Sequence, residues 1–266
     1  AGLGVQSSLR AFAQGFAMSQ NPGPITPAAP PPPAATKPTP QNAVLRDCVD
    51  QVWDMLDAPA RDLAIEGVRR MADYQDPAYA RLYVDRLHSV RQWLPQDPQQ
   101  VMGALARHLA LWMSYEDTVR VADLKTRGSR FQRVSSEVGA QDVQLLRINE
   151  YMHPRFQEVC ETLPAGLGRW LMPSPRWRAW GERLLSRGPV VQTNSLGGFL
   201  LLYMVSALKP WRRHSLRYQQ ENQRIEAWLG LVRQWAPTHP ALALEIVLCQ
   251  SLVKGYSDTH ARGHHH

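Results

Sequence analysis

Acidic and basic side chains share one face of a helix that the sequence predicts in the middle of the chain. The segment ARHLALWMSYEDTVRVADLKTR predicts a helix from about 98 to 125. Its apolar stripe comprises Leu105, Leu109, Trp112 and Val119. Because successive residues turn by about 100°, Glu116 and Asp123 project onto the same stripe. Two carboxylates on an apolar face are unusual, and they define the first candidate site.

Each of these carboxylates has an arginine at helical spacing. Arg120 follows Glu116 by one turn, and Arg127 follows Asp123 in the same way. A charge on a buried face must be paired or neutralised, because an unpaired buried charge is costly. We therefore predict buried ion pairs, Glu116 with Arg120 and Asp123 with Arg127, that fix helix packing. A catalytic pair of carboxylates is the less favoured alternative.

The closing stretch LVKGYSDTHARG, from 252 to 263, crowds ionisable side chains behind an apolar helix. They are Lys254, Tyr256, Asp258, His260 and Arg262. One interpretation is a helix cap followed by a turn, since Gly255 stands at a C-cap position and Asp258 could begin another turn. The other is a polar network at a contact surface, in which Asp258 orients His260 and a neighbouring cation meets an acidic partner group. A third hypothesis is an acid–base enzyme built on Glu116, Asp123 and His260.

Two further segments combine tryptophan with arginine. They are RWRAW at 176–180 and WRRHSLRY at 211–218. Such side chains could stack on bases and contact phosphates, which makes an independent nucleic-acid-binding module the alternative function. They could equally form cation–π contacts within the protein or at a subunit surface. We favour packing, because tryptophan is also frequent elsewhere in the chain.

The sequence segments that must position these groups show the apolar periodicity of helices. Asp76 followed by Pro77 predicts an N-cap and the first residue of a helix. The segment from Ser195 to Leu208 is apolar on all sides, which predicts a central, buried helix. A stripe of Leu242, Ile246, Cys249 and Val253 is expected to join the core. With only weak strand signals at 143–148 and 190–193, the fold class predicted is all-α, a multi-helix globular domain.

The chain divides at a proline-rich segment. Residues 1–18 predict one amphipathic helix, which is expected to end a preceding domain. Residues 19–41 contain NPGPITPAAPPPPAATKPTPQ, which predicts an extended linker. Residues 42–263 form the helical C-terminal domain. The histidines at 264–266 are expected to be a tag remnant.

Composition excludes several classes of site. The three cysteines lie far apart and form no CxxC pair, so we predict no metal site in this chain and a reducing, cytoplasmic location. The longest apolar run is shorter than the roughly 20 residues that span a bilayer, so no membrane partner is expected. The formal net charge of +7 permits an acidic or nucleic-acid partner without establishing one.

Four segments together resemble a known family. They are ADYQDPAYARLYVDRL (72–87), LARHLALWMSYEDTVRVADLKTRGSRFQRV (105–134), SLGGFLLLYMVSAL (195–208) and LVKGYSDTHARG (252–263). This combination, covering about 42 to 263, is similar to the C-terminal helical domain of indolepyruvate ferredoxin oxidoreductases, and most similar to the beta-subunit form. In that form the helical domain follows a smaller gamma-type domain. Ser257 departs from the pattern, which has glycine there.

The resemblance implies oxidative decarboxylation of aryl 2-oxoacids to aryl-acetyl-CoA with ferredoxin. Thiamine diphosphate and iron–sulfur clusters are then expected in the partner alpha subunit, and this chain carries no motif for either. We expect the chain to bind no cofactor, to contribute no catalytic residue, and to serve assembly or active-site shaping. The partners implied are the alpha subunit, ferredoxin, coenzyme A and the aryl 2-oxoacid.

Overall fold

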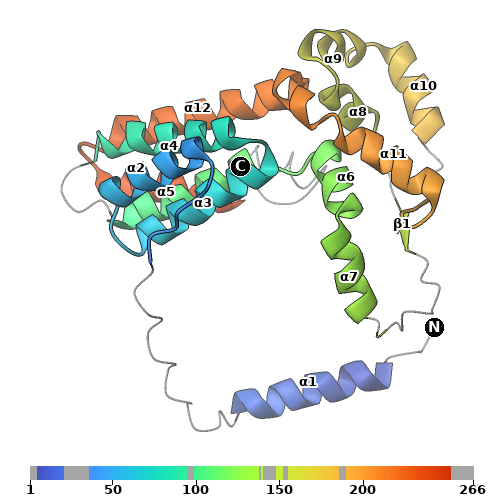
Figure 1. The fold of residues 1–266 in the computed structure, drawn as a ribbon, viewed down its shortest axis with the longest axis horizontal. Coiled ribbons are helices and arrows are strands. Elements are labelled where there is room, and N and C mark those ends of the chain that lie inside the picture. The colour runs from blue at the N-terminus through green and yellow to red at the C-terminus, as the bar shows by residue number, and fades with distance from the viewer. Residues whose placement is uncertain are drawn as a thin grey trace. The chain divides into compact units, whose positions relative to one another are not determined.

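Most of the residues that the structure describes are helical (Figure 1). This computed structural model describes residues 5–20, 36–94, 99–137, 139, 148–151, 155–185 and 190–252. In these residues the sole sheet is a two-stranded antiparallel pair, β1 (Asn149–Tyr151) with β2 (Val190–Gln192), in which Glu150 lies opposite Val191. The predicted all-α class is therefore confirmed.

The chain separates into two units, residues 1–37 and 38–266. The first contains α1 (Val5–Gln20), which exposes Leu9, Phe12 and Phe16 to solvent. These side chains follow the helical spacing seen in the sequence. The assignment of this helix to the end of a preceding domain stays a prediction.

The second unit is built on a helical bundle. Its helices are α2 (Ala43–Met55), α3 (Ala60–Tyr74), α4 (Pro77–Arg91), α5 (Gln99–Met113), α12 (Leu216–Trp235) and α13 (Pro240–Cys249). α4 begins as the sequence predicted, because the Asp76 carboxylate accepts a hydrogen bond of 2.7 Å from the Tyr79 backbone N–H and Pro77 stands in the first turn. The largest buried apolar cluster of the described residues lies among these helices.

Helices α3 and α4 approach each other closely at Gly67. Gly67 of α3 faces the ring of Tyr83 so closely that an added Cβ would lie 2.3 Å from the Tyr83 hydroxyl oxygen. That hydroxyl is fully buried and donates a hydrogen bond of 2.8 Å to the Ala106 carbonyl on α5. Because position 67 is a glycine, the Tyr83 ring of α4 can pack directly against α3 while its hydroxyl binds α5.

The remaining elements form an outer lobe. They are α6 (Thr118–Thr126), α7 (Gly128–Glu137), α8 (Phe156–Thr162), α9 (Ala165–Leu171), α10 (Pro175–Leu185) and α11 (Leu196–Ser206), with β1 and β2. Two short 3₁₀ segments complete the fold, η1 (Lys209–His214) after α11 and η2 (Gln250–Leu252) after α13. The buried apolar cluster within this lobe contains only Ala122, Val191 and Leu202 among the described residues, with Val205 packed beside it. The lobe therefore has little core of its own.

Three sequence predictions about elements are wrong. The helix expected from 98 to 125 is interrupted, because α5 ends at Met113 and α6 begins at Thr118. α11 is not central and buried: of its apolar side chains only Leu202 is buried. In α13 the buried residues are Ala243 and Val247. Of the predicted stripe, Ile246 packs against the core as expected, whereas Leu242 is 42% exposed and Cys249 is also exposed. Val253 lies outside the described residues. In α11 and α13 nearly every residue is apolar, so no polar stripe marked the outward face.

Replacing Gly67 by alanine should destabilise the chain by about 1–3 kcal/mol, because the new methyl group overpacks the contact with Tyr83. Gly230 of α12 is the matched control, since an added Cβ there would meet nothing within 4 Å. Gly230→Ala should be neutral or stabilise by up to about 1 kcal/mol through helix propensity. Urea unfolding of both variants measures the difference. Equal effects would contradict the packing argument.

Candidate functional site

A buried guanidinium group, that of Arg212 on η1, helps to join the outer lobe to the bundle. Its side chain is 2% exposed and donates two hydrogen bonds to the Asp117 carboxylate, of 2.7 Å from Nε and 3.2 Å from Nη2. Nη1 donates to the Tyr74 carbonyl at 2.7 Å and to the Gln75 side chain at 2.9 Å. An arginine stays charged even when it is buried, so its burial is tolerated only when such partners compensate the charge.

Arginines of η1 and α12 also lie over tyrosine rings, which belong to the bundle and to the connection between α5 and α6. The Arg212 guanidinium carbon lies 4.2 Å from the centre of the Tyr74 ring, and that of Arg213 lies 5.5 Å from the Tyr79 ring. Burial raises the pKa of Tyr74 well above its ordinary value, so this ring stays neutral. These contacts agree with the favoured interpretation of WRRHSLRY as cation–π packing.

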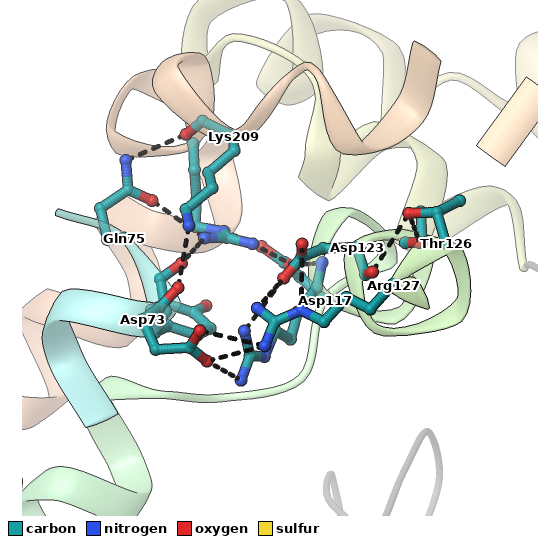
Figure 2. Close-up of polar contacts among 11 residues, drawn as sticks. Asp73, Gln75, Asp117, Asp123, Thr126, Arg127 and Lys209 are labelled. Atoms are coloured by element: carbon teal, nitrogen blue, oxygen red, sulfur yellow. Dashed lines mark hydrogen bonds and ion pairs between the residues drawn. The ribbon is translucent and has the colours of Figure 1, made fainter. Parts of the chain in front are cut away.

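A second layer of charges surrounds this junction (Figure 2). Asp123 on α6 pairs with Arg127 at 2.6 Å and with Arg120 at 3.0 Å. Both arginines also reach Asp73 near the end of α3, at 3.0 and 2.9 Å. Lys209 donates to the Asp73 backbone carbonyl at 2.8 Å, and burial lowers its pKa. The network thus connects α3, α6 and η1, which are distant in sequence.

Only half of the predicted ion-pair ladder forms. Asp123 and Arg127 do pair, but both side chains are half-buried where buried ones were expected. Glu116 does not pair with Arg120: it is exposed, and its carboxylate has no ion-pair partner within the described ranges. The interruption between α5 and α6 turns Glu116 outward and places the next residue, Asp117, inward. Asp117 then caps α6 by accepting a hydrogen bond of 2.6 Å from the Arg120 backbone N–H, and it holds Arg212.

A further buried acid, Glu221 of α12, escaped the sequence analysis. It is 0% exposed, accepts a hydrogen bond of 2.8 Å from the Trp112 indole N–H, and pairs with Arg217 at 3.0 Å. Arg217 also reaches Glu161 of α8 at 2.9 Å, so it links the outer lobe to α12. The one signal in the sequence was the spacing of Arg217 and Glu221, one helical turn apart.

The polar cluster predicted in the closing stretch, Lys254, Tyr256, Asp258, His260 and Arg262, lies outside the described residues, as does the 264–266 segment. No group of three or more His, Cys, Asp or Glu side chains in the described ranges could hold a metal ion. No helix there is long and apolar enough to cross a membrane.

The surface most suited to binding lies on α9 and α10, which Figure 1 shows at one edge of the outer lobe. We call it the indole ridge: Trp170, Trp177 and Trp180, exposed by 62%, 42% and 60%. The rings form a continuous row, with centroids 6.2 Å apart for the first two and 6.1 Å for the last two. Helices α9 and α10 carry four arginines and one glutamate, so the ridge lies in a basic environment.

The chain thus contains an all-α domain. Its outer lobe has a small core and exposes the basic, aromatic indole ridge. The chain belongs to the family described as Family of unknown function (DUF6537), which matches residues 60–266. Comparison with curated proteins and with solved structures finds no match.

Removing the carboxylate of Asp117 should destabilise the fold by about 3–5 kcal/mol, because it leaves the Arg212 charge buried without its partner. Glu116→Ala, one residue earlier, is the matched control and should change the free energy of unfolding by less than about 0.5 kcal/mol. Chemical denaturation of both variants measures these values. An equal loss in the two variants would show that the junction does not depend on this pair.

The charges at the junction also predict that the stability of the fold depends on pH in the acidic range. Burial alone would raise the pKa of Asp73, but hydrogen bonds from Arg120 and Arg127 and their charges hold it below the ordinary value of 3.8. A lowered pKa in the folded state adds stability above the unfolded pKa, and this stability is lost as the pH falls through the folded pKa. Asp73→Asn should therefore be less stable than the parent at neutral pH.

The difference between parent and Asp73→Asn melting temperatures should shrink as the pH falls below about 4. Asp62→Asn is the control, because this exposed carboxylate lies on the same helix away from the junction network. Thermal unfolding across the acidic range measures both differences. A parent-to-variant difference that stays constant with pH would argue against the role given to Asp73.

Proposed function

We propose that this chain is a non-catalytic helical domain that holds together the subunits of an oxidoreductase acting on aryl 2-oxoacids. The indole ridge carries the proposal. Exposed tryptophan and arginine side chains are the residues that most often dominate the energy of protein interfaces. A lobe with so few buried apolar residues also gains stability when a partner covers it.

The resemblance to indolepyruvate ferredoxin oxidoreductases supplies the proposed chemistry. The partner would be the alpha subunit, which would hold thiamine diphosphate and the iron–sulfur clusters. The cysteines of this chain do not fit a cluster, because Cys48, Cys160 and Cys249 stand on α2, α8 and α13 and no described group of ligands gathers around them. In this proposal the chain carries out no catalytic step. Its role is to assemble the cytoplasmic complex or to shape substrate access.

A nucleic-acid-binding module is the second candidate, supported by the same arginines. The geometry of the ridge favours a protein partner instead. The Trp177 and Trp180 rings meet edge to face, with their planes 88° apart. The edge of one ring therefore lies against the face of the other, and the two nearly perpendicular rings are not arranged to stack on successive bases.

The test is assembly with a co-expressed alpha subunit. Trp177→Ala combined with Trp180→Ala should weaken the complex by at least about tenfold, as expected for truncated hot-spot residues. Trp93→Ala is the control, since this side chain is 54% exposed on the bundle. Sedimentation measures the complex, and circular dichroism checks folding. Indolepyruvate turnover should require the complex.

Two results would contradict the proposal. One is turnover of indolepyruvate by the isolated chain. The other is failure to assemble with the alpha subunit while the chain binds a single-stranded oligonucleotide with steep salt dependence, since that is the behaviour of a nucleic-acid module.

A further inference from the structure

Helix α11 presents an apolar face that no other described residue of the second unit covers. Its exposed large side chains are Leu196 (78%), Leu200 (46%), Leu201 (47%), Tyr203 (56%) and Met204 (62%), followed by Leu208 (45%) just beyond the helix. A helix that is apolar all round is normally buried on all sides. At eleven residues α11 is too short to span a membrane. Its outer face therefore needs a protein surface.

The inner face of α11 already has its partner. Leu202 packs in the cluster with Ala122 of α6 and Val191 of β2. Gly198 is also explained within the chain, because an added Cβ would lie 2.1 Å from the Gln192 carbonyl oxygen. Gly197 is different: an added Cβ would meet nothing within 4 Å. The outer face thus contains a small residue that the chain's own packing does not require.

The outer face carries no charge. From Leu196 to Leu208 there is no Asp, Glu, Lys or Arg. A two-fold interface brings identical patches together, so any charge on the patch would lie close to its own copy. An uncharged apolar face avoids that repulsion, whereas a partner recognised through charge would gain nothing here.

The pattern of side-chain sizes along α11 also suits a second copy of the same helix. Leu196, Gly197, Leu200, Tyr203 and Met204 share a sector of about 120° at 3.6 residues per turn. In an antiparallel pair whose two-fold axis passes Leu200, residues equally far before and after it lie opposite each other. Leu196 then faces Met204, and the small Gly197 leaves room for the Tyr203 ring.

We propose that two copies of this chain associate through their α11 helices, packed antiparallel about a two-fold axis at Leu200. A stable interface buries about 800 Å² per partner, with an apolar centre and a polar rim. The exposed leucines, tyrosine and methionine of α11 supply that centre. This inference goes beyond the proposed function and does not rest on it, because self-association is measured without the alpha subunit.

Sedimentation velocity of the full chain over a range of concentrations tests the proposal. The parent should form a dimer in reversible equilibrium with the monomer. Leu200→Glu should weaken dimerisation by at least about a hundredfold, since it places two carboxylates together at the axis. Leu231→Glu is the control, because Leu231 is 49% exposed on α12, and it should dimerise like the parent. Urea unfolding confirms that both variants remain folded.

A charge pair tests the register. Leu196→Lys and Met204→Glu should each weaken the dimer, and the double variant should recover at least about tenfold of the affinity lost, because each lysine then faces a glutamate of the other copy. Within one helix these positions are two turns apart and cannot pair. A parent that is monomeric at every concentration, a dimer unaffected by Leu200→Glu, or no recovery in the double variant would each overturn the proposal.

Discussion

The buried guanidinium of Arg212 is the constraint around which the second unit is organised. It draws its hydrogen-bond acceptors from the end of α3, from the residue that follows, and from the cap of α6. Satisfying a buried arginine demands all of these at once, since each lost acceptor would leave a donor unpaired at a cost of about 1–3 kcal/mol. The position of α6 relative to the bundle follows from that demand, and so does the break after α5 that brings Asp117 inward.

The outer lobe contacts the bundle largely through polar groups. Many apolar side chains of the lobe therefore take no part in that contact. Salt bridges from Arg120 and Arg127 to Asp73, and from Arg217 to Glu161, make much of the connection. Meanwhile the indole ridge and the outer face of α11 remain exposed. Directional ion pairs fix orientation more closely than apolar contact does, so the lobe can hold these two surfaces in a defined position. That arrangement suits a domain whose proposed task is assembly.

Local features of the chain could be predicted, and relations between distant segments could not. The N-cap at Asp76 and the pair of Asp123 with Arg127 depend on neighbours within one turn, and both are present, although the pair is half-buried instead of buried. The prediction for Glu116 failed because helical periodicity was carried through a break at which Asp117 both caps α6 and binds Arg212. The prediction that α11 is buried failed for another reason. The hydropathy of a helix indicates that its apolar side chains favour burial, but it does not indicate whether the same chain or another molecule buries them.

Hydrogen–deuterium exchange on the chain, alone and in its assembled complex, tests most directly the claim that the outer lobe is the assembly surface. The account predicts slower exchange on assembly in α9 and α10, which carry the indole ridge, with the amides of α3 and α4 in the bundle unchanged, since their protection already comes from the core. Unchanged exchange throughout α9 and α10, with new protection confined to the bundle, would contradict it.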